Sequence, residues 1–177
     1  DNGDVLYPSS SSIPWFNVYD GMRVWVNYTI LGDTNGREDI DYWVKINDIS
    51  EILTKGIFML TPEKEDSIGH DPVEIRDYWF TGDYLTIIFR YGGGGTIHFI
   101  NLVQDVDNPE NEEGLPVLEL RHNRRDDRKN YLMQGTVSFN LAALKKEGSN
   151  SVSFILKAKN FSDRDDFEKE LTYEYGE

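Results

Sequence analysis

The chain has 177 residues, no cysteine and a formal net charge of −14, from 32 Asp and Glu against 18 Lys and Arg. This acidic balance repels phosphates, so we expect no nucleic-acid partner. Aromatic residues make up 13% of the chain, more than a disordered acidic chain carries, so a folded protein is expected.

Apolar and polar residues alternate through residues 22–30, which is typical of a half-buried strand. A second alternation covers residues 40–46. The segment between them, residues 32–36, is rich in Gly, Asp and Asn, which favour tight turns. The two segments are predicted to form a β-hairpin.

Residues 48–56 combine two signals. Asp48 and Glu51 have the spacing of a helix capping box, but the run is barely two turns long, so a short turn or a bent strand is expected. The composition then becomes polar and rich in proline. We place a linker at residues 63–72, between an N-terminal β-domain at 1–62 and a C-terminal domain at 73–177.

Strand-like segments recur beyond the linker at about the 8–12-residue spacing of a β-sandwich. Seven are predicted, at residues 73–79, 84–91, 96–103, 117–122, 131–140, 152–159 and 167–175. They favour a seven-stranded antiparallel sandwich. The fold class is therefore all-β, which argues against folds that hold nucleotides at helix N-termini.

Six strings follow one another in a specific order, at residues 26–30, 44–55, 71–74, 99–103, 119–123 and 135–141. Their combination resembles the NigD-like family of exported lipoproteins from Gram-negative anaerobes. The resemblance implies an OB-type barrel followed by a β-sandwich, in a periplasmic or outer-membrane-tethered protein. The family brings no assigned activity and no cofactor, and its name derives from an operon associated with bacteriocin production.

Family members usually carry a lipidated cysteine and further barrel strands ahead of the part that matches residues 1–8, and this sequence has neither. The resemblance therefore implies an OB-like domain that lacks its first strands. It is truncated, closed by another element, or completed by a partner molecule. Membrane attachment is expected only through an N-terminal lipid anchor, which this chain does not contain.

Trp25 and Trp43 are candidate binding residues, because they fall on the opposite face from the apolar residues of their predicted strands. Two indoles across a hairpin could form a stacking platform for sugar rings. The alternative is that both faces of the hairpin are covered.

Arg121, His122 and Asn123 end a predicted strand and offer directional hydrogen-bond donors for a carboxylate or a sugar hydroxyl. The other histidines are His70 and His98, and none of the three has the spacing of a zinc site. A packed or hydrogen-bonded role is therefore expected for His98.

The acidic loop at residues 105–113 offers Asp105, Asp107 and Glu110 as candidate Ca²⁺ ligands. Glu110 stands where an EF-hand loop needs glycine, so a solvated loop is favoured over a metal site. The pair Asp126-Asp127 is interpreted as turn charges, because neighbouring carboxylates on a strand face opposite ways. Ser67 is a candidate glycosylation site, since Asp66-Ser67-Ile68 resembles a short bacterial O-glycosylation motif.

These patterns together predict a non-catalytic module of the cell envelope that binds a peptide, a protein or a glycan. The first alternative is a bacteriocin-associated or immunity-like interaction protein, whose acidic surface would suit a cationic partner. A glycan hydrolase is a more distant alternative.

Overall fold

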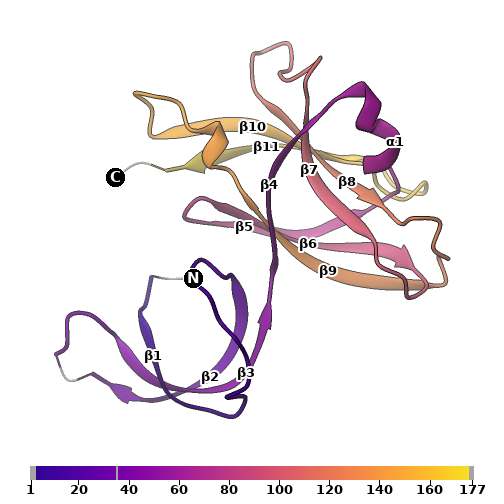
Figure 1. Ribbon diagram of the computed structural model, residues 1–177. Helices are drawn as coiled ribbons and strands as arrows, with labels where there is room; N and C mark the ends of the chain where they lie inside the picture. The colour runs from indigo at the N-terminus through magenta and orange to yellow at the C-terminus, as the bar shows by residue number, and fades with distance from the viewer. Residues whose placement is uncertain (1–2, 35, 176–177) are drawn as a thin grey trace. The chain divides into compact units, whose positions relative to one another are not determined.

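A computed structural model describes residues 3–34 and 36–175 (Figure 1). Nearly all of its regular structure is β-strand, which confirms the predicted all-β class. The chain divides into two compact units, Asp1–Leu53 (unit 1) and Thr54–Glu177 (unit 2). Within the described residues, no helix is long and apolar enough to cross a membrane.

Unit 1 contains a three-stranded sheet, whose strands are labelled in Figure 1 and pair in the order β1-β3-β2. Its strands are β1 (Leu6–Ser11), β2 (Val24–Asp33) and β3 (Tyr42–Glu51). β2 and β3 are antiparallel and form the predicted hairpin, while β1 runs parallel to β3 on its other side. The alternation of apolar and polar residues therefore predicted this hairpin correctly.

The described part of unit 1 has a small core. Ile40, Val44 and Ile52 are its buried apolar residues, whereas more than half of the Ile30 and Leu31 side chains is exposed. An OB barrel has five strands arranged in a partly open barrel. The three strands described here leave β1 and β2 at the edges of the sheet, which fits the predicted partial OB-like domain.

Unit 2 is one continuous sheet in the order β11-β10-β8-β7-β4-β9-β6-β5. Its strands are β4 (Leu53–Leu60), β5 (Glu74–Thr81), β6 (Tyr84–Gly93), β7 (Phe99–Asp105), β8 (Val117–Asn123), β9 (Tyr131–Asn140), β10 (Ser151–Ala158) and β11 (Phe167–Glu174). Short helical turns are η1 (Pro62–Lys64), α1 (Glu65–Ile68) and η2 (Ala142–Leu144).

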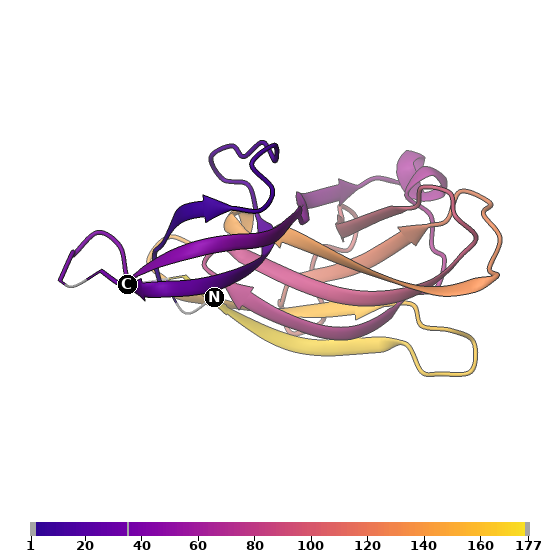
Figure 2. The same ribbon diagram turned by 90° about the horizontal axis from the view of Figure 1, so that it is seen from below.

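The sheet of unit 2 folds into two layers around one apolar core (Figure 1). Phe80 of β5 lies over the rings of Phe154 in β10 and Tyr173 in β11, at centroid distances of 6.4 and 6.2 Å. Alternate residues of β6 and β9, including Ile87 and Phe139, are completely buried in the same core. Figure 2 shows the long strands running beside one another, with the β8–β9 loop (orange) and the β10–β11 loop (yellow) at the same end.

All seven strands predicted for the C-terminal half are present as β5 to β11, but β4 adds an eighth. The prediction of a purely antiparallel sheet is wrong for two strand pairs, because β4 runs parallel to β7 and β8 runs parallel to β10. Alternation within a strand reports which face is buried and carries no information on the direction of the neighbouring strand.

The observed division between the units lies after Leu53, earlier than the linker placed at residues 63–72. Ile57 to Leu60 pair with Leu102 to Asp105 of β7, which makes β4 part of unit 2. The proposed linker forms η1 and α1, and Ile68 is buried with Leu60 and Val103. One apolar residue in a polar, proline-rich segment therefore anchors it to the sandwich.

Candidate functional site: a polar network at the loop end of the sandwich

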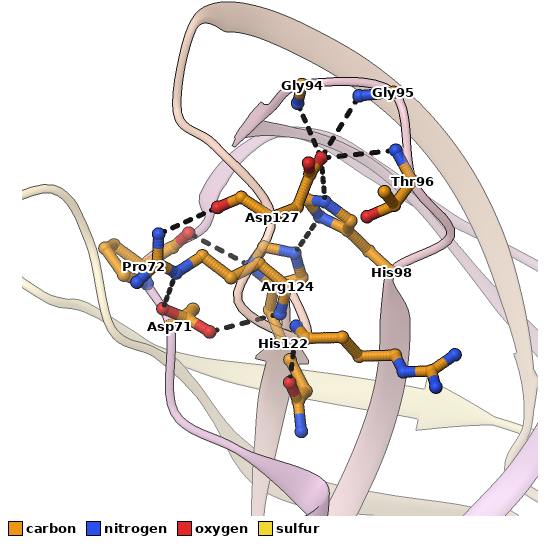
Figure 3. A network of polar contacts seen from close by, with 11 residues as sticks. Asp71, Pro72, Gly94, Gly95, Thr96, His98, His122, Arg124 and Asp127 are labelled. Atoms are coloured by element: carbon orange, nitrogen blue, oxygen red, sulfur yellow. Dashed lines mark hydrogen bonds and ion pairs between the residues drawn. The ribbon is translucent and has the colours of Figure 1, made fainter.

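Three segments of unit 2 meet around a buried polar network (Figure 3). They are the β6–β7 loop at residues 94–98, the β8–β9 loop at residues 124–130 and the segment 69–72 that precedes β5. The glycines allow the close approach, since a Cβ atom on Gly94 would lie 2.9 Å from Oδ1 of Asp127.

Asp127 is the anchor of the network. Its Oδ2 accepts hydrogen bonds from the backbone N–H groups of Gly94 (2.6 Å), Gly95 (3.1 Å) and Thr96 (3.3 Å), and it lies 3.0 Å from Nε2 of His98. Successive N–H groups that point at one oxygen form an anion-binding nest. The Gly94 N–H and then His98 hold the pKa of the Asp127 carboxyl well below its ordinary value.

The network continues through two histidines. Nδ1 of His98 lies 2.8 Å from Nε2 of His122, and Nδ1 of His122 lies 3.3 Å from the Pro72 carbonyl oxygen. The Tyr91 ring covers both imidazoles, at centroid distances of 4.8 and 5.3 Å. Burial, and then the charge of His98, lower the pKa of His122 to about 4.

Arg124 ties the β8–β9 loop to the segment before β5. Its Nε donates to Oδ1 of Asp71 at 2.9 Å, and its Nη1 donates to the Asp127 carbonyl at 2.9 Å. The next two residues, Arg125 and Asp126, have φ angles of 53° and 61°, a strained conformation for residues with a Cβ atom. Such strain persists only where surrounding contacts fix the backbone, and here Asp71 and Asp127 supply them.

The space around the network is small. Beside His122 lies a cavity of about 30 Å³, lined by Asp71, Pro72, Gly92, His122, Arg124, Lys129 and Phe161. It has room for about one water molecule. An open groove of about 510 Å³ also borders Arg124, and it is lined by Asp66, Asp71, Asn123, Arg124, Arg125 and Asp126. The four ring nitrogens of His98 and His122 all have partners, so neither ring presents a free nitrogen to a substrate.

The structure separates the predicted cluster Arg121 to Asn123. Arg121 is 5% exposed and donates to Gly69, Glu119 and Glu65. Asn123 donates to the Ser67 carbonyl at 2.9 Å. Arg121 and Asn123 thus fasten α1 to β8, whereas His122 joins the network, and the three do not converge on one ligand position.

The structure does not bring Trp25 and Trp43 together. Trp25 is paired with Ser50 and Trp43 with Gly32, near opposite ends of the β2–β3 hairpin. Trp25 is 46% exposed. The Trp43 ring contacts the Tyr7 ring at a centroid distance of 4.9 Å, and the Arg37 guanidinium lies 5.6 Å from the centre of the Trp43 ring. The two indoles therefore form no shared stacking surface.

The acidic loop forms its own turn. Asp105 accepts hydrogen bonds from the Asp107 N–H and the Asn108 side chain, while Glu110 forms a bridge with Pro116. Within residues 3–34 and 36–175, no group of three or more His, Asp or Glu side chains is arranged to hold a metal ion.

Ser67 lies in α1, exposed, and its hydroxyl donates to the Lys64 carbonyl at 2.9 Å. Modification at this serine is not tested by the fold and stays a prediction.

Sequence reasoning missed Asp71, His98, Arg124 and Asp127 as parts of one network. The sequence alone indicates a turn charge for Asp127 and a packed or hydrogen-bonded role for His98, without joining the two. The signal that could have found them is the run Gly92 to Gly95 followed closely by a histidine, since consecutive glycine N–H groups can bind an anion.

Large apolar side chains are exposed at the same end of the sandwich as the network, and we call this set the loop-end patch: Ile97 and Phe99 on either side of His98, and Tyr131, Leu132 and Met133 at the start of β9. Leu132 points to the opposite face of β9 from Tyr131 and Met133. Ile97 and Tyr131 are the most exposed, at 75% and 67%. The Arg125 guanidinium lies 4.9 Å from the centre of the Phe99 ring. Exposed cations also occur in the β8–β9 loop at Arg128 and Lys129, although the chain as a whole is acidic.

An OB-type sheet followed by an eight-stranded sandwich defines a class of all-β proteins with two units. Two family models cover almost the whole sequence: the NigD-like N-terminal OB domain matches residues 1–52, and the NigD-like C-terminal beta sandwich domain matches residues 56–173. The chain belongs to the NigD-like family, as its strings of residues indicate.

Solved structures agree with this assignment. A putative toxin-related protein from Parabacteroides distasonis is 32% identical, with a TM-score of 0.78 over 96% of this chain and 81% of that chain. A protein of unknown function, DUF1344, from Bacteroides vulgatus is 28% identical, with a TM-score of 0.79 over 98% and 80%. A NigD-like immunity protein from Bacteroides caccae shares the fold at 20% identity, with a TM-score of 0.77 over 98% and 87%. No curated protein matches the chain.

Proposed function

We propose that this chain is an exported, non-catalytic interaction module of the cell envelope, which binds a peptide or protein partner through the loop-end patch. The observation that carries the proposal is the exposure of Ile97 and Tyr131, at 75% and 67%. Ile97 follows the backbone of Gly94 to Thr96, which Asp127 holds in place, and Tyr131 begins β9. Exposed apolar groups on a rigid frame are typical of interaction sites.

The chemistry of the network supports binding over catalysis. A general base needs a nitrogen or oxygen within reach of a substrate proton. His122 is 1% exposed, its ring nitrogens face His98 and Pro72, and the adjoining cavity of about 30 Å³ suits one water molecule. The network therefore acts as a rigid support for the loops. That the protein is exported is proposed from its membership of the NigD-like family.

The cations beside the patch favour a partner with acidic and apolar groups. Arg125, Arg128 and Lys129 are exposed around the patch. Arginine and aromatic residues are also enriched at the centres of protein interfaces. An extended acidic segment with one or two large apolar side chains fits this surface.

An immunity-like role is the second candidate. It is supported by the net charge of −14 and by the names of two similar structures, one toxin-related and one an immunity protein. Here the acidic surface would take a cationic partner. The two candidates therefore predict partners of opposite charge.

Selection from a random peptide library displayed on phage tests both. Wild-type protein should enrich acidic, apolar peptides, and Ile97→Asp should weaken their binding by about tenfold. Val106→Asp is the matched control, because Val106 is an exposed apolar residue just beyond the opposite end of β7.

Enrichment of basic peptides, unaffected by Ile97→Asp, would favour the second candidate over the first. If Ile97→Asp and Val106→Asp lose peptide binding equally, or if the wild type enriches no peptides, binding of peptides at the loop-end patch is contradicted.

A further inference from the structure

The partners of the ring nitrogens limit how many protons the two histidines can carry if all three ring contacts are hydrogen bonds. The network ends in two groups that only accept: the Asp127 carboxylate and the Pro72 carbonyl. The first contact therefore needs a proton on Nε2 of His98, and the last needs one on Nδ1 of His122. The contact of 2.8 Å between the two rings needs a third proton. Two neutral imidazoles carry only two protons.

We infer that His98 and His122 together hold three protons in the closed network, and that loss of the third releases Pro72 and loosens residues 69–72. The module would then contain a pH-sensitive clasp. This pH response goes beyond the proposed binding function, because it concerns residues 69–72, which border the groove beside Arg124. It would be present whether the partner is acidic or basic.

The third proton belongs on His98. Its Nε2 lies 3.0 Å from the Asp127 carboxylate, so an imidazolium there forms an ion pair. His122 then stays neutral, with its proton on Nδ1 toward Pro72 and its Nε2 accepting from His98. The pKa of His122 is lowered first by burial and then by the charge of His98, which is consistent with this arrangement.

The charges around the rings balance with three protons present. Asp127, in the β8–β9 loop, faces the His98 imidazolium, and Asp71, in the segment before β5, faces Arg124. Tyr91 of β6 covers both rings, and Lys129 lines the small cavity beside His122. Removing the third proton leaves Asp127 without a cation at hydrogen-bonding distance among the described residues.

When the third proton is lost, one of the three ring contacts is left with an acceptor on both sides and no proton between them. If His98 keeps its proton on Nε2, its Nδ1 becomes an acceptor and His122 must donate through Nε2. The lone pair on Nδ1 of His122 then faces the Pro72 oxygen. At 3.3 Å this is the longest contact between the rings and their partners, and hence the first to open.

Other contacts keep the segment in place when the clasp opens. The Asp71 N–H donates to the His122 carbonyl at 2.8 Å, and Arg121 donates to the Gly69 carbonyl at 2.9 Å. Opening therefore loosens residues 69–72 locally and leaves the sandwich folded. Because Asp71 lines the groove beside Arg124, the change alters one wall of that groove.

Nitrogen-15 NMR of the histidine rings in the full chain tests the inference without any substitution. At about pH 6, His98 should show two protonated nitrogens and His122 one. As the pH rises, one proton should leave the pair. Exchange of the Asp71 amide, corrected for its intrinsic pH dependence, should then increase by about fivefold, because its bond to the His122 carbonyl opens more often once the neighbouring contact to Pro72 is lost.

Asp127→Asn removes the negative charge and should reduce the pair to two protons at about pH 6. His70→Gln is the matched control, because His70 is partly exposed, contacts Glu119 and lies outside the network. Two protons in the wild type at every pH would overturn the inference. If the pair keeps three protons up to alkaline pH and the exchange of the Asp71 amide does not change, the inference that the segment loosens with pH is wrong.

Discussion

Acidification should destabilise unit 2 through His122. The pKa of this residue is lowered from 6.5 to about 4 in the folded chain. Between these two values the unfolded state binds a proton that the folded state does not, so stability falls as the pH decreases from about 6.5 to about 4. Below about 4 both states are protonated, and His122 causes no further loss.

The magnitude follows from the two pKa values. At about 1.4 kcal/mol for each pH unit between 6.5 and about 4, the contribution of His122 is about 3 kcal/mol. The physical cause is clear in the geometry. A further proton on Nε2 of His122 would point at the Nδ1–H of His98 across 2.8 Å, inside a site that is 1% exposed.

Urea unfolding at several pH values between about 7 and 4 measures this effect. NMR signals of Val137 and Phe139 report unit 2 alone, since both lie in its core. His122→Gln does not titrate, so its stability should change with pH by about 3 kcal/mol less than that of the wild type. His70→Gln should keep the slope of the wild type. Equal slopes for the wild type and His122→Gln would refute the reasoning.

Three further predictions concern single residues. Gly94→Ala places a Cβ atom 2.9 Å from Asp127 and should lower the free energy of unfolding by about 1–3 kcal/mol, measured by urea unfolding. Tyr173→Phe removes a hydroxyl that donates to Asp83 at 2.6 Å and should cost about 1–2 kcal/mol in the same assay, whereas no change would mean that solvent replaces this bond fully. Chain isolated from its bacterial host should carry a glycan mass that Ser67→Ala removes, and identical masses would contradict glycosylation at this serine.

Strand positions could be predicted because they depend on local alternation. The buried residues Leu85, Ile87 and Phe89 alternate in β6, and any sheet that covers one face of this strand requires the pattern. The bent-strand interpretation of residues 48–56 is also confirmed, since β3 continues to Glu51 and β4 begins at Leu53. Asp48 and Glu51, which have the spacing of a capping box, are instead polar residues on exposed positions of β3.

Contacts between distant segments could not be predicted in the same way. His98 and Asp127 are separated by 29 residues and meet because β6 and β7, like β8 and β9, are joined by loops at the same end of the sandwich. That meeting depends on which strands are neighbours, and alternation does not report it. The separation of Trp25 from Trp43 has a similar origin, because it depends on the register of β2 with β3.

The two protonation steps of the histidine pair affect different contacts of the network. A fourth proton, near pH 4, breaks the contact between His98 and His122, whereas loss of the third at higher pH breaks the contact with Pro72. The fourth proton leaves the Nδ1–H of His122 toward Pro72 in place but lowers the stability of unit 2 as a whole, so the Asp71 amide is protected most between the two steps. Protection of the Asp71 amide should pass through a maximum with pH, and His122→Gln should remove the acid side of that maximum. A protection profile that rises steadily with pH in the wild type would mean that the third proton does not hold the clasp.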